Sequence, residues 1–189
     1  MNAFNKTATE KEEKDYSTPE GLTGAKVVAV CYLGEVEKDY GSGPQMKDLY
    51  ELVWSCHKQN EFNEHYIMTQ EFEPFLSQEG ASKPTNFSKM IKGTKWAFDK
   101  ETTLDTLLSR KAGLQIIKKK AKASGRIYSA IDSFLDFDDT KGYEETGKII
   151  LPPWYADKSQ YKDIICNKNV LVKVKDGEPI KLSEAHAPF

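Results

Sequence analysis

The sequence contains no long hydrophobic run, and its apolar stretches are short, for example residues 27–30. A membrane-spanning helix needs about 20 consecutive apolar residues, so we expect no segment of this chain to cross a membrane. The first fifteen residues are polar and include Glu10, Glu12, Glu13 and Asp15. We therefore expect neither a secretory signal nor a transit peptide, and a cytoplasmic location.

Cysteine is scarce, with Cys31, Cys56 and Cys166 as the three examples. An odd number of widely spaced cysteines does not form a disulfide framework, so we expect a reducing compartment. The motifs of common enzymes are also missing. There is no Gly-x-x-x-x-Gly-Lys-Ser/Thr phosphate loop and no Gly-x-Ser-x-Gly elbow.

The residues that resemble catalytic or metal-binding groups lack the required spacing. Cys56 and His57 are adjacent, so on a strand they point to opposite faces and cannot act as a nucleophile and base. With His65 they would still lack a fourth zinc ligand. We expect no catalytic residue, no metal and no cofactor.

An acidic cluster at Asp136, Asp138 and Asp139 is the remaining candidate for a metal site. It departs from the EF-hand pattern, because Lys141 stands where glycine is required and Gly147 stands where the bidentate glutamate is required. We interpret this segment as a solvated acidic loop, and a metal-dependent nuclease that uses it as a third-ranked alternative.

Charge is abundant and unevenly distributed, although the formal net charge of the chain is only -2. Residues 83–126 hold twelve basic and three acidic side chains, a net charge of +9, and the remainder carries a net charge of -11. A basic block of this kind can bind a polyanion while the rest of the surface keeps the protein dissolved. The alternative is that these lysines simply face water.

The pattern of apolar residues predicts a mainly β protein. We expect strands at residues 25–33, 47–58, 64–72, 113–122 and 126–137, with a glycine-rich loop at 35–45. Phe87, Met90 and Ile91 have helical spacing before Gly93, which we expect to end a helix, and a short helix is expected at 102–108. This order predicts a five-stranded OB-fold barrel with a helical insertion between strands 3 and 4.

We divide the chain into a flexible N-terminal arm (1–23), an OB-fold nucleic-acid-binding domain (24–152) and a C-terminal extension (153–189) with a strand-like piece at 169–175. The arm has no periodic apolar face, so its deletion is expected to leave stability unchanged.

Several short motifs resemble those of phage-encoded OB-fold proteins regarded as single-stranded-DNA-binding proteins. The similarity covers residues 25–152 and consists of short, degenerate motifs. They are Leu33-Gly34, Tyr40-Gly41, Leu52-Val53-Trp54, the series Lys83, Phe87, Lys89, Ile91 and Gly93 with Phe98 after it, the turn Leu107-Leu108-Ser109-Arg110-Lys111, the series Gly125, Tyr128 and Ile131, and Pro152. Ser109 departs from the glycine that the family favours. The resemblance implies an OB-fold, single-stranded DNA as the partner, and the cytoplasm of an infected host cell.

Binding of a single strand needs cations that follow phosphates and flat side chains on which bases stack. The aromatic candidates are Tyr50, Trp54, Tyr66, Trp96 and Tyr128, and the basic candidates are Lys89, Lys92, Lys95, Lys118, Lys120 and Arg126. Groove and barrel core are equally open for Trp54 and Tyr66. Alternation along the strand places Lys119 on the face opposite to Lys118 and Lys120.

The sequence thus predicts a sequence-tolerant, non-enzymatic single-stranded-DNA-binding protein for phage DNA replication, recombination or repair. The alternative from another class is a protein-interaction or virion accessory module on the same barrel. The chain ends in Pro188-Phe189, similar to the tails of bacterial single-strand-binding proteins, so Phe189 is a candidate contact for replication or recombination proteins. A frayed polar end is the other interpretation.

Overall fold

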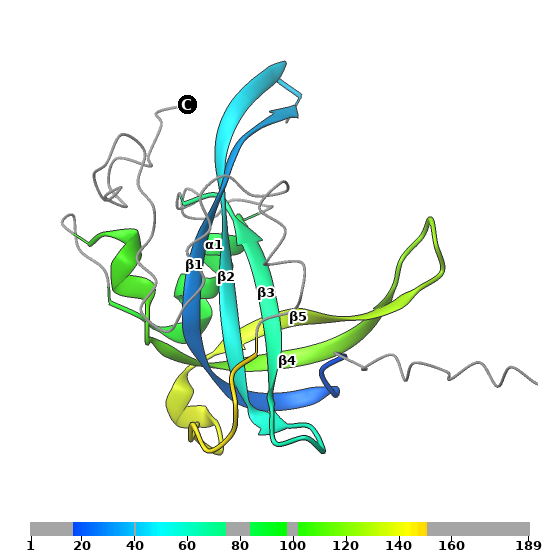
Figure 1. Ribbon diagram of the computed structural model, residues 1–189. Coiled ribbons are helices and arrows are strands. Elements are labelled where there is room, and N and C mark those ends of the chain that lie inside the picture. Colours follow the sequence, from blue (N-terminus) through cyan, green and yellow to red (C-terminus); the bar gives the residue numbers. More distant parts are fainter. Residues whose placement is uncertain (1–16, 40, 75–83, 98–101, 151–189) are drawn as a thin grey trace, which may run out of the picture.

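Five antiparallel strands and one α-helix make up the computed structural model, which describes residues 17–39, 41–74, 84–97 and 102–150 (Figure 1). The elements are β1 (Gly21–Asp39), β2 (Pro44–Gln59), β3 (His65–Phe72), α1 (Asn86–Thr94), the 3-10 helix η1 (Leu104–Leu107), β4 (Lys111–Lys120), β5 (Ile127–Leu135) and the 3-10 helix η2 (Phe137–Asp139). The predicted mainly β class and the helix between strands 3 and 4 are confirmed. Among the described residues, no helix has the length and apolarity that crossing a membrane requires.

The sheet is open, with strand order β3-β2-β1-β4-β5. No ladder joins the outer strands β3 and β5 within the described part of the chain, so the predicted barrel is present only as a curved sheet. Thr18 spans the gap between these strands. Its hydroxyl donates to the carbonyl oxygen of Ile67 in β3 at 3.5 Å, and its own carbonyl oxygen accepts from Ser129 Oγ in β5 at 2.6 Å.

Strand β1 is longer than predicted at both ends. Residues 21–23 pair with residues 114–116 of β4, and Thr18 is fully buried, so the N-terminal arm cannot extend to residue 23 without removing part of the sheet. The loop predicted at 35–45 is mostly a ladder between β1 and β2. Asp39 Oδ1 accepts the amide hydrogens of Gly41 and Gly43, both at positive φ, so the glycine-rich signal is confined to a tight turn.

Helix α1 packs on the inner face of the sheet. Thr85 caps its start by accepting the amide hydrogen of Ser88 at 3.1 Å, and Phe87 and Met90 are buried. The helix continues through Gly93, contrary to prediction, and ends at Lys95 in the left-handed conformation. Gly93 is needed for close approach rather than for termination, because a Cβ atom there would lie 2.2 Å from the carbonyl oxygen of Phe134 in β5.

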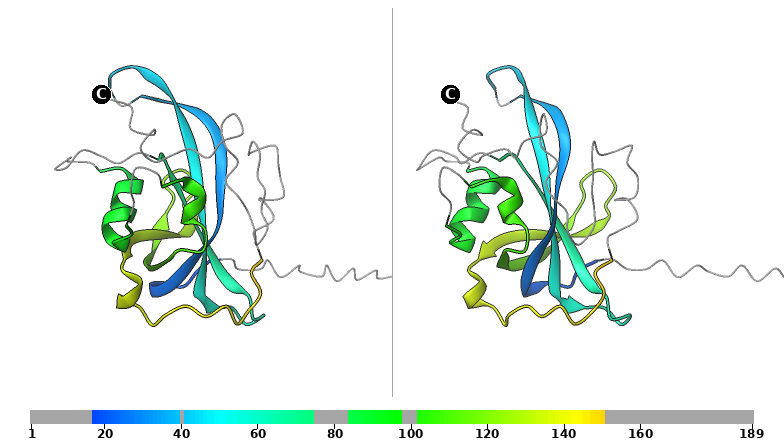
Figure 2. Two further views of the ribbon diagram at one scale, coloured as in Figure 1. Left: turned by 90° about the vertical axis from the view of Figure 1, so that its left-hand side faces the viewer. Right: turned by 60° about the vertical axis from the view of Figure 1, so that its left-hand side comes forward.

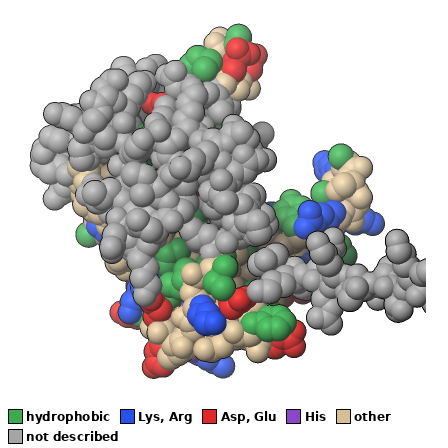
Figure 3. All heavy atoms as spheres, viewed as in Figure 1, with side chains coloured by type: hydrophobic (Ala, Val, Ile, Leu, Met, Phe, Trp, Pro, Cys, Tyr) green, Lys and Arg blue, Asp and Glu red, His purple; other side chains and the backbone are tan. Residues whose placement is uncertain are grey.

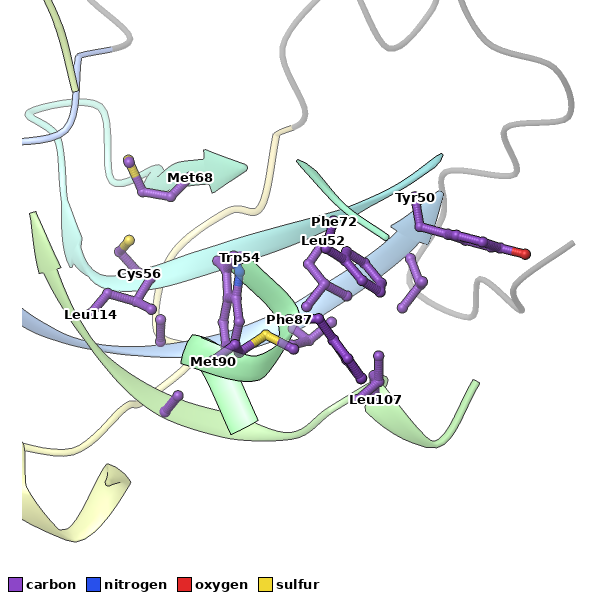
Figure 4. Packing of buried hydrophobic residues seen from close by; sticks show 14 of the residues in the cluster. Tyr50, Leu52, Trp54, Cys56, Met68, Phe72, Phe87, Met90, Leu107 and Leu114 are labelled. Atoms are coloured by element: carbon purple, nitrogen blue, oxygen red, sulfur yellow. The ribbon is translucent and has the colours of Figure 1, made fainter. Parts of the chain in front are cut away.

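The core lies between the concave face of the sheet and α1 (Figure 4). Trp54 points from β2 toward the helix, and its ring centroid is 5.8 Å from that of Trp96 and 6.0 Å from that of Phe134. Tyr50, Leu52 and Cys56 share this face of β2 and are fully buried. Aromatic and aliphatic side chains from β2, β3, α1 and β4 therefore form one continuous cluster.

The segment after η2 crosses the opposite face of the sheet. It passes over Gly24 and Gly113, which are paired across β1 and β4, and a Cβ on Gly24 would lie 2.0 Å from the carbonyl oxygen of Gly142. His57 Nδ1 then accepts the amide hydrogen of Glu144, and His65 Nε2 accepts that of Gly147, each at 3.1 Å. The predicted acidic loop is thus fastened to β2 and β3 by two histidines.

Replacing Gly93 with alanine tests the close packing of α1 on β5. In an exposed helix this change stabilises by up to about 1 kcal/mol. Here the added methyl group meets backbone, so we expect Gly93→Ala to lower the free energy of unfolding by about 1–3 kcal/mol, measured by urea denaturation. Lys92→Ala, at an exposed position of the same helix, should stay within about 0.5 kcal/mol of the parent. A stabilised Gly93→Ala protein would contradict this packing.

Candidate nucleic-acid interface

Two hairpins extend beyond the body of the sheet because their strands outlast their neighbours (Figures 1 and 2). β4 pairs with β1 only through Ile116, so its later residues pair with β5 alone. We call residues 118–129 the basic hairpin, since it holds five cations and no acidic residue. Likewise β2 pairs with β3 only from Tyr50 onward, and residues 35–48 form what we call the acidic hairpin, with four acidic and two basic residues.

Register sorts the side chains of the basic hairpin onto two faces. Directly opposed residues in antiparallel strands lie on the same side of the sheet, so the pair Lys119 and Tyr128 shares a face. Arg126 directly precedes β5, and its carbonyl oxygen accepts the amide hydrogen of Ala121 at 2.9 Å, so the pairing continues by one residue and alternation places Arg126 on that face. We call these three residues the Tyr128 face. The tyrosine is 44% exposed and Lys119 and Arg126 are exposed, so this face combines one aromatic ring with two cations that contact solvent.

The opposite side of the basic hairpin carries Lys118 and Lys120, which pair with Ser129 and Ile127. Lys118 is engaged within the protein. Its ammonium donates to the carbonyl oxygen of Thr18 at 3.0 Å and to Ser129 Oγ at 2.9 Å, and it also contacts Ser17 Oγ. This cation therefore fastens the N-terminal segment to β5. Lys120 is exposed.

The predicted stacking role is wrong for two residues. Tyr50 and Trp54 are 0% exposed, and both side chains lie within the core, so neither presents a ring to a base. Trp54 is covered by α1 and by Trp96 after it, and Tyr50 packs on Phe72 of β3 with ring centroids 5.9 Å apart. Trp54 is therefore a packing residue.

Trp96 and Tyr66 are partly buried against the same core. One side of Trp96 stacks on Trp54, the Arg110 guanidinium carbon is 5.5 Å from the Trp96 ring centroid, and the indole nitrogen donates to the carbonyl oxygen of Lys111 at 2.9 Å. Burial lowers the pKa of Arg110. These contacts favour a structural role for Trp96, while a role for Tyr66 in binding stays a prediction.

The lysines of the helical region form a second, separate group. Lys89, Lys92 and Lys95 are exposed, and Lys95 pairs with Asp136 at 3.2 Å. The amide hydrogen of Asp138, and then Lys95, lower the pKa of Asp136. The helix meets β5 at Phe134, six residues from Tyr128, which is about 20 Å along a strand. The structure thus separates predicted site residues that the sequence had grouped.

The side chains considered as a nucleophile or as metal ligands are buried or hydrogen-bonded within the protein. Burial raises the pKa of the Cys56 thiol to about 12, so it is not a thiolate near neutral pH. His65 Nδ1 donates to the carbonyl oxygen of Cys56 at 2.7 Å while its other nitrogen accepts from Gly147, and His57 Nδ1 accepts from Glu144. In the described ranges, no three His, Cys, Asp or Glu side chains gather as metal ligands would.

Sequence reasoning missed Lys119, which the register places directly opposite Tyr128. Alternation within β4 separates Lys119 from its neighbours, but only pairing across the turn reveals which side carries the tyrosine. The basic hairpin is visible at the right of the space-filling view as a projection with blue side chains (Figure 3).

No protein-family model matches the chain, and no curated protein matches its sequence.

The two lysines on one face of the basic hairpin offer a matched test of the Thr18 contact. We expect Lys118→Ala to lower the free energy of unfolding by about 1–2 kcal/mol, because hydrogen bonds from a charged group to partly buried oxygens are lost. Lys120→Ala, two residues away and exposed, should be within about 0.5 kcal/mol of the parent. Urea denaturation measures both. Equal effects would show that Lys118 does not fasten the N-terminal segment.

Proposed function

We propose that the protein binds single-stranded DNA without sequence preference, in phage DNA replication, recombination or repair, and that the Tyr128 face of the basic hairpin makes the central contact. The carrying observation is the cross-strand pair of Lys119 and Tyr128 with Arg126 beside it. An exposed ring stacks on any base, and the flanking cations neutralise the adjacent phosphates. No bond is made or broken in this function.

The fold is compatible with this proposal. We infer that the curved sheet is an OB-fold whose β3–β5 closure is made through Thr18 instead of a ladder. The loop between strands 4 and 5 is one of the elements with which OB-folds bind oligonucleotides, and here it is the basic hairpin. The exposed lysines of α1, about 20 Å along β5 from Tyr128, would contact phosphates further along the same strand.

A protein-interaction module is the second candidate, favoured by the acidic hairpin that also projects from the body. The two candidates differ in a titration of labelled oligonucleotide. A protein-interaction module has no affinity for the oligonucleotide at about 50 mM salt, whereas the proposed function requires binding that weakens steeply with salt.

Tyr128 and Ile127 provide a matched pair for the stacking contact, since they are adjacent, exposed and on opposite faces. With an oligonucleotide short enough to hold one protein, we expect Tyr128→Ala to weaken binding by about 1–3 kcal/mol. Ile127→Ala should leave this affinity unchanged, and both variants should keep the parental melting temperature. Equal affinities of the two variants, measured by fluorescence anisotropy, would remove Tyr128 from the site.

The salt dependence counts the cations that contact phosphates. Between about 50 and 200 mM salt, affinity should fall by orders of magnitude if six or more phosphates are neutralised. The slope of log affinity against log salt should become shallower by about 0.7 for Lys119→Ala and again for Arg126→Ala. Lys47→Ala, on the acidic hairpin, should leave the slope as it is. A parental affinity independent of salt would refute the electrostatic part of the proposal.

A further inference from the structure

The two most exposed large hydrophobic side chains among the described residues stand on the two projecting hairpins. Ile127 on the basic hairpin is 64% exposed, and Met46 on the acidic hairpin is 57% exposed. Neither contributes to the core, and neither belongs to the Tyr128 face. A single exposed apolar side chain is common on protein surfaces, so the charged residues around each of these two decide whether it belongs to a contact surface.

Each of these apolar side chains has a charged partner directly across its hairpin, and the two charges are opposite. Ile127 pairs with Lys120, while Met46 pairs with Glu37, and both charged residues are exposed. On the acidic hairpin, Asp39 belongs to the same face as Glu37 by alternation, whereas Lys47 pairs with Val36 and belongs to the other face. The two surfaces are therefore complementary in charge, and each has an apolar centre.

The two surfaces do not meet within one molecule. The acidic hairpin extends from one end of β1 and β2, and the basic hairpin leaves the body in another direction, with separated tips in all three ribbon views (Figures 1 and 2). The space-filling view shows the same separation, with acidic and apolar atoms at one projection and basic and apolar atoms at the other (Figure 3). A second copy of the chain can supply the missing partner for each.

We propose that copies of this protein associate head to tail, with the Glu37–Met46 pair of one copy against the Lys120–Ile127 pair of the next. Such a contact joins two different surfaces, so it continues from copy to copy instead of closing into a symmetric dimer. It occupies the side of the basic hairpin opposite to the Tyr128 face. Nucleic acid and the neighbouring copy therefore use opposite faces of one hairpin.

The contact is small, because each partner offers one face of a two-stranded hairpin. Interfaces well below about 1,000 Å² are weak and transient, so we expect monomers at micromolar concentration and association only toward millimolar concentration. Copies bound side by side on one strand have a high effective concentration, and the contact then makes binding to long strands cooperative. This last consequence, unlike the association itself, rests on the proposed function.

Charge reversal provides the test, measured by sedimentation velocity at low salt without DNA. We expect Glu37→Lys and Lys120→Glu each to weaken self-association at least about tenfold, since like charges then face each other across the contact. An equimolar mixture of the two variants should associate as the parent does, because every contact between unlike copies pairs opposite charges. Lys119→Glu, which makes the same charge change on the opposite face, should associate like the parent.

Single variants that associate like the parent, or a mixture that fails to regain association, would overturn the contact. The result is independent of DNA. Association restored in the mixture together with no affinity for a short oligonucleotide would support the contact and refute the proposed function. Affinity for a short oligonucleotide, together with a mixture that does not regain association, would support the proposed function and refute the contact.

Discussion

The cluster in which Trp54 stacks on Trp96 and contacts the tilted ring of Phe134 is the interaction on which the arrangement of this protein depends. It joins the middle of β2 to the segment after α1 and to the far end of β5, with ring centroids 5.8 and 6.0 Å apart. Gly93 allows the helix to approach β5 closely enough for the stack to form. Trp54 is therefore unavailable to a ligand and Tyr50 is buried as well, so the stacking surface that we propose lies on the basic hairpin.

The projecting hairpins follow from unequal strand pairing. β1 pairs with β4 only up to Lys26, and β2 pairs with β3 only from Tyr50. Beyond these residues β1 and β2 pair with each other alone. A two-stranded hairpin has two exposed faces, unlike a sheet that packs on a core. Alternation then gives each hairpin two chemically distinct surfaces from one short sequence. That is why a stacking contact and a contact between copies can share the basic hairpin.

The surroundings of each charged side chain depend on the strand face that carries it and on the residue opposite, not on the number of charges in the segment. Lys118, Lys119 and Lys120 are consecutive, yet the first fastens Thr18, the second stands opposite Tyr128 and the third stands opposite Ile127. The acidic hairpin is likewise divided, with Glu37 beside Met46 and Lys47 on the other side. Equal side chains at adjacent positions thus have different surroundings, and our proposals assign nucleic-acid binding to Lys119 and association to Lys120.

The sequence by itself determined the β class, the helix between strands 3 and 4 and the basic block, because alternation, helical spacing and charge are local properties. Counting outward from a two-residue turn at Ser124-Gly125 would have paired Tyr128 with Ala121, whereas the four-residue loop 122–125 pairs it with Lys119. Segments far away in the chain decided the burial of Tyr50 and Trp54, the pairing of residues 21–23 with β4 and the role of Lys118. Only the tertiary structure decided them, since alternation defines two faces of a strand and packing alone determines which face is covered.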